Sequence, residues 1–220
     1  MSTGNQIPQN DHYFTAAPAS PEERRTIEVE IAGRSVEVET AGGIFSPGHI
    51  DAGTRVLLKE MTAPPSGHLL DLGCGWGPIA LTMATLTPSA SVWAVDVNER
   101  SLDLTRSNAQ NLGLSNVRAV FPDQVPPEIQ FSEIWSNPPI RVGKDVLHSL
   151  MLRWLPRLVP GASAFQVVQK NLGADSLHSW LNEQFSRHNP EALMYADTVR
   201  MASSKGFRVL ETIREEPEDN

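Results

Sequence analysis

The sequence predicts an α/β protein built on a doubly wound, mostly parallel sheet. Short apolar runs of strand length alternate with segments of helical periodicity from residue 68 to residue 213. The first of these runs ends at glycines on alternate positions, Gly73, Gly75 and Gly77, and a proline follows where a helix should begin. The next run ends in Asp96, which lies 19 residues beyond Gly77. These three observations together indicate a nucleotide-type pocket at one edge of the sheet.

The elements before the sheet are predicted as follows. Residues 1–25 are rich in Ala, Pro, Ser and Asn and are expected to form a flexible arm. Residues 26–31 and 35–40 alternate with period two, which is typical of a hairpin with one polar face. The glycine-rich segment 42–53 is expected to fold over a bound ligand and form part of the pocket wall. It leads into a helix at 54–61.

The sheet itself is predicted from seven apolar runs and four intervening helices. The strands are expected at 68–72, 91–96, 117–121, 131–136, 162–168, 192–199 and 206–213, and the helices at 79–86, 99–112, 145–155 and 174–187. A short turn joins the last two strands. We therefore expect one domain over residues 26–214, followed by an acidic tail at 215–220.

Charge distribution, the absence of long apolar runs and the cysteine count limit the classes of protein to which the chain can belong. The net charge of −8 is uneven, because the half of the body after Ile140 carries a net charge of +4. The sequence has no apolar run of membrane-spanning length and no signal peptide at its polar start. Cys74 is the single cysteine, which excludes an internal disulfide. We expect a cytoplasmic protein with no membrane partner and no metal site.

The glycine turn is suited to a ligand that lies on the backbone. Without Cβ atoms the turn can adopt positive φ, and the helix that follows presents N–H groups to an anion. The spacing G-x-G-x-G differs from the dinucleotide fingerprint G-x-G-x-x-G. Asp96 is placed to accept hydrogen bonds from ribose hydroxyls, while Asn98 is the better candidate for the next helix cap. The alternative is a purely structural turn. Cys74, which lies between two of the glycines, is expected to be a small turn residue and not a nucleophile.

The chemistry is predicted at Ser136-Asn137-Pro138-Pro139-Ile140, which ends the fourth strand of the sheet. The two prolines remove two N–H donors and leave the Pro138 carbonyl and the Asn137 amide oxygen as acceptors. Such a pair can grip an NH2 group and stabilise positive charge that develops on its nitrogen. In isolation, an ordinary turn after a strand would explain the same residues.

The order of these motifs resembles the class I S-adenosylmethionine (SAM) methyltransferases that modify planar amino groups. The segments Gly43-Ile44-Phe45-Ser46, Asp51-Ala52-Gly53-Thr54 and 168–174 are similar to those of the RsmC-like ribosomal RNA guanine-N2 methyltransferases. The resemblance covers about residues 12–213. It implies a Rossmann-like, seven-stranded sheet with helices on both faces and SAM as the cofactor.

The resemblance also implies roles for individual residues. The SAM site would comprise Asp71, Gly73, Cys74, Gly75, Gly77, Asp96, Val97, Asp123 and Asn137, with Asp123 or its neighbours near the adenine. The target amine would be held by Asn137, Pro138, Pro139 and Ile140. Arg141 and Lys144 are expected to contact RNA phosphates, and Arg153, Arg157 and Lys170 are weaker candidates for that role. Two departures stand out: Ile140 replaces the Phe or Tyr found in related proteins, and the chain has no room for a second copy of the domain.

Three functions follow from this reading. The first is methylation of a guanine N2 amine in small-subunit ribosomal RNA or in the assembled subunit, with the base flipped into the pocket. The second is N-methylation of a protein glutamine or a small planar amine. The third is a non-catalytic SAM-binding factor in ribosome assembly.

Overall fold

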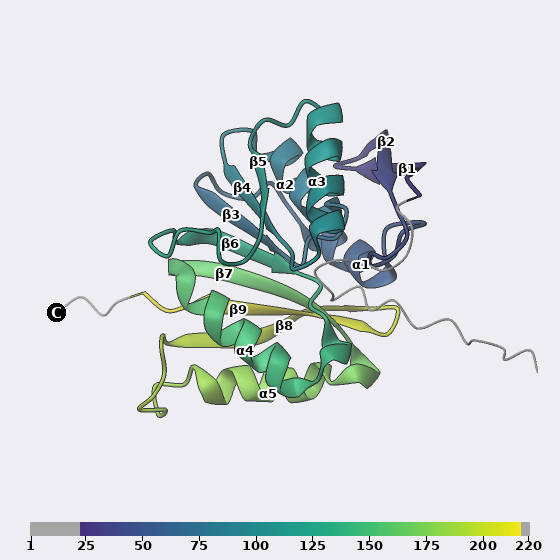
Figure 1. Ribbon diagram of the computed structural model, residues 1–220. Coiled ribbons are helices and arrows are strands. Elements are labelled where there is room, and N and C mark those ends of the chain that lie inside the picture. The colour runs from purple at the N-terminus through teal and green to yellow at the C-terminus, as the bar shows by residue number, and fades with distance from the viewer. Residues whose placement is uncertain (1–22, 217–220) are drawn as a thin grey trace, which may run out of the picture.

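The computed structural model describes residues 23–216 (Figure 1). Residues 1–22, which make up most of the predicted arm, and residues 217–220 of the predicted tail lie outside the described residues. Within the described part, Glu215 is tied to the fold, because its backbone N–H donates to the Tyr195 carbonyl at 2.9 Å and its side chain pairs with Arg187.

A seven-stranded sheet forms the centre of the molecule, as predicted. Its strand order is β5-β4-β3-β6-β7-β9-β8, and β9 alone runs antiparallel to the other six strands. The strands are β3 (His68–Leu72), β4 (Ser91–Val95), β5 (Val117–Val120), β6 (Phe131–Ser136), β7 (Leu158–Gln169), β8 (Ala196–Ser204) and β9 (Phe207–Arg214).

Helices cover both faces of the sheet, which confirms the doubly wound prediction (Figure 1). One face packs against α1 (Ala52–Glu60), α2 (Pro78–Leu86) and α3 (Glu99–Asn111), whose buried side chains include Leu57, Met83 and Leu102. The other face packs against α4 (Lys144–Trp154) and α5 (Ala174–Gln184), through residues such as Trp154 and Leu181. Three short 3-10 turns lie at Ile140–Val142, Leu155–Arg157 and Lys170–Leu172.

The strand order reverses between β3 and β6, the point where doubly wound sheets bind ligands. The two strands run parallel, and Leu72 at the end of β3 pairs with Ser136 at the end of β6. The Ser136 hydroxyl donates to the Leu72 carbonyl at 2.7 Å. The glycine turn and the Asn-Pro-Pro segment therefore leave the sheet side by side.

The N-terminal hairpin, β1 (Arg25–Ile31) and β2 (Arg34–Thr40), forms a separate two-stranded sheet beside α3 (Figure 1). Ile31 and Val38 from its apolar face pack with Trp76 and Leu104. Asn108, fully buried in α3, accepts from the Glu39 N–H at 2.6 Å and donates to the Trp76 carbonyl at 3.0 Å. The hairpin therefore braces the segment that follows the glycine turn.

The largest boundary differences occur in the C-terminal part of the chain. Strand β7 begins at Leu158 and not at 162. Helix α5 ends at Gln184 and not at 187, and β8 spans Ala196–Ser204 and not 192–199. Between α5 and β8, the Asn189 side chain donates to the Gln184 carbonyl at 2.8 Å. This turn, together with Pro190, whose ring lacks an N–H donor, replaces the start of the expected strand.

Candidate active site

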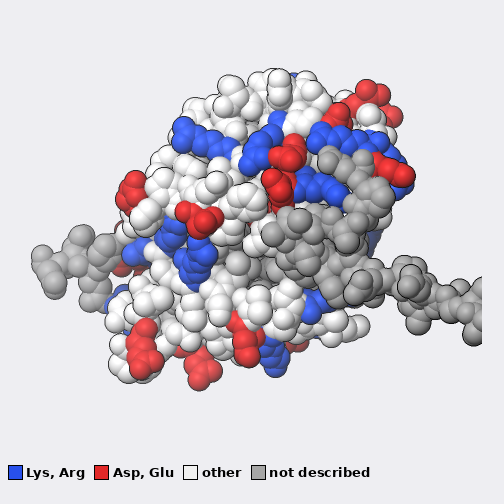
Figure 2. Space-filling model, viewed as in Figure 1, with Lys and Arg blue, Asp and Glu red and all other residues white. Residues whose placement is uncertain are grey.

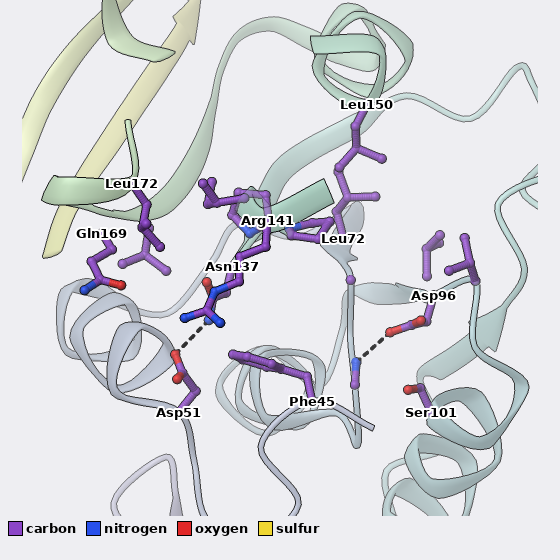
Figure 3. A pocket seen from close by; sticks show the side chains of 18 of the residues that line it. Phe45, Asp51, Leu72, Asp96, Ser101, Asn137, Arg141, Leu150, Gln169 and Leu172 are labelled. Atoms are coloured by element: carbon purple, nitrogen blue, oxygen red, sulfur yellow. Dashed lines mark hydrogen bonds between the residues drawn. The ribbon is translucent and has the colours of Figure 1, made fainter. Parts of the chain in front are cut away.

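A cavity of about 370 Å³ lies at the carboxyl ends of β3, β4, β6 and β7 (Figure 3). At one end it is lined by Gly73, Gly75, Asp96 and Ser101, and at the other by Phe45, Asp51 and Asn137. Its remaining lining residues are Leu72, Val95, Val97, Pro122, Pro138, Pro139, Ile140, Arg141, Leu150, Val167, Gln169, Leu172 and Phe207. Gly77, also predicted in the SAM site, lies outside this lining. This volume suits a small-molecule ligand.

The glycine turn adopts the conformation that its sequence predicts. Gly73, Gly75 and Gly77 all have positive φ, at 84°, 57° and 99°. The Gly73 N–H donates to the Val95 carbonyl at 2.8 Å, and the Gly75 N–H donates to Asp96 Oδ2 at 2.9 Å. A Cβ on Gly77 would lie 3.1 Å from the Thr105 side chain. The turn is thereby fixed to β4 and to the carboxylate that ends it.

Asp71 lies in β3, just before the glycine turn, and is not among the cavity-lining residues. Its side chain is fully buried, and Oδ2 accepts from the Ala80 N–H at 2.9 Å. Burial raises the pKa of this carboxyl to about 8, with a smaller contribution from the nearby Asp96. The expectation that the start of α2 offers its N–H groups to a ligand is therefore wrong at Ala80, because the chain's own carboxyl group occupies that donor.

Asp96 is held in a fixed orientation at the end of β4. One carboxylate oxygen accepts from Gly75, and the other accepts from the Asn98 N–H at 2.9 Å. Burial raises the pKa of this group above its ordinary value. Asn98 caps α3 as predicted, since its side chain accepts from the backbone of Arg100 and Ser101. Asp96 therefore does not cap the helix, and its carboxylate lines the cavity.

Asn137 lies across the cavity from Asp96 (Figure 3). Its side-chain nitrogen Nδ2 donates to Asp51 Oδ2 at 2.9 Å and to Thr54 Oγ1 at 3.0 Å. The Pro138 carbonyl accepts from the Ile140 N–H at 2.9 Å, across an inverse γ-turn at Pro139 with φ −73° and ψ 80°. The Asn137 oxygen and the second lone pair of the Pro138 carbonyl are thus the two acceptors of this segment.

Three other predicted SAM-site residues differ in their positions. Cys74 is buried, and burial raises the pKa of its thiol well above the ordinary value, as expected for a turn residue that is not a nucleophile. Val97 lines the cavity and is 45% exposed. Asp123 is exposed and lies outside the lining, which includes its neighbour Pro122 instead.

The structure separates the five basic residues that were expected near RNA. Arg141 lines the cavity, whereas Lys144 and Lys170 are exposed and lie outside its lining. Arg153 donates to the Pro122 carbonyl at 2.6 Å, and Arg157 donates to the Pro126 and Ile129 carbonyls at 2.6 and 2.8 Å. These two arginines hold the loop after β5, and a phosphate contact stays a prediction for both.

Sequence reasoning missed part of the wall at the Asn137 end. The segment 42–53 was expected to form part of the pocket wall, and Phe45 and Asp51 confirm that role. Gln169, Leu172 and Phe207 come from β7, the 3-10 turn after it and the start of β9, and were not expected there. The sequence signal for Gln169 was its position directly after the strand predicted at 162–168, because ligands bind at the carboxyl ends of such strands.

Charged side chains of both signs are interspersed over the face shown in Figure 2. Within residues 23–216, no group of three or more His, Cys, Asp or Glu side chains is arranged to hold a metal ion. Among the helices of this described part, none combines the length and apolarity needed to span a bilayer.

Comparisons with known proteins give a consistent picture. Residues 35–195 match the family model of the methyltransferase small domain. The uncharacterized protein YbxB of Bacillus subtilis is 32% identical over 180 residues, which are 80% of this chain and 90% of YbxB. Ribosomal RNA small subunit methyltransferase C of Pseudomonas entomophila is 32% identical over 135 residues, which are 60% of this chain and 40% of that protein.

A solved structure with the same fold is the T. thermophilus 16S rRNA N2 methyltransferase RsmC, in complex with AdoMet and guanosine. The TM-score is 0.72 at 22% identity, and the match covers 90% of this chain and 52% of that protein. The chain therefore spans about half, or less, of the length of the named ribosomal RNA methyltransferases.

Proposed function

The chain belongs to the methyltransferase small domain family, and we propose that it methylates the exocyclic N2 amine of a guanine in small-subunit ribosomal RNA. The observation that carries this proposal is the orientation of Asn137. Both hydrogens of its side-chain amide are directed to acceptors of the chain, so its oxygen remains for a substrate N–H.

The protein is a SAM-dependent methyltransferase. When bound, SAM supplies a methyl carbon made electrophilic by a positively charged sulfur. In our proposal, Gly73 and Gly75 lie along the methionine part, Asp96 accepts from the ribose hydroxyls, and the wall at Pro122 contacts the adenine. The fixed carboxylate of Asp96 and the Cβ-free turn fit this division.

The amine end of the site is suited to an NH2 group whose lone pair is delocalised into a ring. Such a nitrogen is a poor nucleophile until its hydrogens are held out of the ring plane. The Asn137 oxygen and the Pro138 carbonyl can accept those two hydrogens and direct the lone pair towards the methyl group. They would also stabilise the positive charge that nitrogen gains as its bond to the methyl carbon forms and the carbon–sulfur bond of SAM breaks. The methylated nitrogen then loses one proton to solvent. Positioning and charge stabilisation then account for the reaction without a dedicated general base.

The choice of a guanine in ribosomal RNA is supported by the relatives, two of which are named as small-subunit ribosomal RNA methyltransferases. The pocket contributes apolar walls that suit a flat base, namely Phe45, Ile140 and Leu172. Phe45 supplies an aromatic ring at the cavity wall even though Ile140 stands where related proteins carry one. Arg141 at the cavity lining, with Lys144 outside it, is proposed to contact the RNA backbone. We place the reaction in the cytoplasm, on ribosomal RNA or the small subunit.

The direct test is methyl transfer from tritiated SAM to total RNA, free small subunits and total protein from cells that lack this gene. We expect label in small-subunit RNA, recovered as N2-methylguanosine after digestion to nucleosides. Label confined to protein would overturn the guanine assignment in favour of a glutamine side chain. Tight SAM binding with no label in any fraction would overturn the catalytic assignment in favour of a binding role.

The matched control is the Asn137→Ala variant, assayed with the same fractions. It lacks the amide oxygen but keeps Gly73, Gly75 and Asp96, so it should bind SAM and leave the RNA unlabelled. Equal labelling by this variant would show that the transfer does not depend on the proposed amine receptor.

A further inference from the structure

Asp51 has two structural roles: it caps a helix, and it contacts Asn137. It caps α1, where its Oδ2 accepts from the Gly53 N–H at 2.7 Å and from the Thr54 N–H at 3.3 Å. The same oxygen accepts from Nδ2 of Asn137, a residue 86 positions later in the chain, as the dashed line in Figure 3 shows. The cap of a helix thus reaches the residue proposed to hold the amine.

This contact decides which end of the Asn137 amide faces the substrate. An amide has two donors on nitrogen and one acceptor oxygen, and here Asp51 and Thr54 use both donors. Turning the amide over would place its oxygen against an Asp51 oxygen that already accepts two backbone hydrogen bonds. Two acceptors facing each other repel, and an unpaired group in a partly buried site is costly.

We propose that Asp51 is a positioning residue for catalysis, which acts through Asn137 by presenting the oxygen of that side chain to the substrate amine. Thr54 assists by accepting the second hydrogen. Without Asp51, the amide could rotate and offer an NH2 group to the incoming NH2 group, and the amine would lose an acceptor. This inference rests on the proposed amine-methylating function, but not on the identity of the amine.

Gly53 shows that the arrangement leaves little space. A Cβ at this position would lie 3.0 Å from Asp51 Oδ2 and 3.0 Å from the Phe207 ring. A side chain there would push either the carboxylate or the ring that lines the cavity. The Asp51-Ala52-Gly53-Thr54 segment therefore brings two hydrogen-bond acceptors to Nδ2 of Asn137, and Gly53 leaves room for the Asp51 carboxylate and the Phe207 ring.

The segment is also anchored at its other end. The Asn98 side chain donates to the Gly43 carbonyl at 3.0 Å, and the Arg100 guanidinium donates to the Gly42 carbonyl at 2.7 Å. Both donors come from the start of α3, close to Asp96. The loop that carries Phe45 and Asp51 is therefore held between the cofactor end and the amine end of the cavity.

The test compares three variants. Asp51→Ser keeps a side chain that can cap α1 but is too short to reach Asn137. Asp51→Asn keeps an acceptor oxygen at full reach and removes the charge. Thr54→Val removes the second acceptor and leaves the cap side chain unchanged. For each variant we would measure kcat, KM for the methyl acceptor, the SAM dissociation constant, the melting temperature and the pH profile of kcat.

We expect Asp51→Ser to lower kcat about 30-fold, with the SAM dissociation constant within about twofold of the parent value. Thr54→Val should lower kcat by about 3- to 10-fold. Asp51→Asn should recover kcat to within about fivefold of the parent, with an unchanged pH profile. If Asp51→Asn is as inactive as Asp51→Ser, the carboxylate charge itself is required and the positioning role is wrong. Full activity of Asp51→Ser would also overturn it.

A second readout does not depend on any substrate. The side-chain NH2 of Asn137, assigned in nitrogen NMR spectra through the Asn137→Ala variant, should exchange slowly with solvent in the parent and faster in Asp51→Ser. Unchanged exchange would contradict the proposed contact. If ribosomal RNA proves not to be the substrate, the proposed function fails, but this readout and kinetics on whichever substrate is labelled still test Asp51.

Discussion

The two ends of the cavity are built in different ways. The end that we propose for the cofactor, here called the cofactor end, is made from the backbone of one turn and the carboxylate of the next strand, Asp96, which bonds to that turn directly. The end that we propose for the substrate amine, the amine end, is assembled from side chains of separate segments, among them Phe45, Asp51, Asn137 and Phe207. The two ends meet at Gly73, because a Cβ at this position would lie 4.0 Å from the backbone carbonyl oxygen of Asn137.

In our proposal, this difference gives the two ends separate parts of the activity. A site made of backbone is rigid and holds a constant ligand, here SAM. A site made of side chains from distant segments depends on each contact and selects the substrate. Substitutions at the cofactor end should therefore change affinity for SAM, whereas substitutions at the amine end should change turnover.

The strongest test of this division is Asn137→Ala. Loss of the acceptor that stabilises charge on the amine should lower kcat by about 100- to 1000-fold. The SAM dissociation constant, measured by calorimetry, should stay within about twofold. Equal losses in both quantities would mean that the two ends are not separable at this residue.

The converse test is Asp96→Ala. Two backbone N–H groups and the proposed ribose contacts lose their acceptor, so SAM affinity should fall by about 30- to 100-fold. With SAM at saturating concentration, kcat should recover most of its value. Asp96→Asn, which keeps one acceptor oxygen, should give an intermediate affinity. An unchanged dissociation constant for Asp96→Ala would remove this residue from the cofactor site.

Arg141→Ala probes the rim of the amine end. We expect KM for RNA to rise by about 5- to 10-fold, with kcat and SAM affinity nearly unchanged, because a phosphate contact adds affinity without chemistry. The salt dependence of KM should weaken in parallel. Lys144→Ala, outside the cavity lining, should show a smaller effect, and the opposite order would exchange their roles.

The last prediction concerns stability and not activity, and it should appear at the cofactor end alone. Burial raises the pKa of Asp71 from 3.8 to about 8, so the folded state retains a proton that the unfolded state releases in this interval. This contribution to stability is complete below about pH 4 and is lost as pH rises through about 8. Urea unfolding at several pH values should show it.

The matched variant for that measurement is Asp71→Asn, which is neutral at every pH and keeps an acceptor for the Ala80 N–H. Between pH 4 and pH 8 the parent should lose a few kcal/mol relative to this variant. Parallel curves for the two proteins would mean that Asp71 does not hold a proton in the folded state.

The same contrast explains what could be predicted from the sequence. The cofactor end follows from contiguous patterns, since a strand, alternate glycines and an acid after the next strand are all local. The sheet topology follows from the alternation of apolar runs and helices. Asn137 was predicted because its two prolines leave a recognisable pattern of acceptors after a strand.

The remainder of the site depends on tertiary contacts that have no local signature. Nothing near Asp51 in the sequence indicates that its carboxylate reaches Asn137, because the two meet only when α1 packs beside the end of β6. Arg153 and Arg157 look like free surface cations in the sequence. In the fold they bond to backbone carbonyls of the loop after β5, a use of arginine that charge counting cannot distinguish from RNA contact.

The hydrogen bond between Asp51 and Asn137 also has a genetic consequence. If Asp51 contributes to turnover only by orienting Asn137, then replacing Asp51 in a chain that already lacks Asn137 should lower kcat almost no further. The two substitutions would then be strongly non-additive, although the residues are 86 positions apart. A library that varies one position at a time would score both as indispensable, while only paired variation would reveal that they form one functional unit.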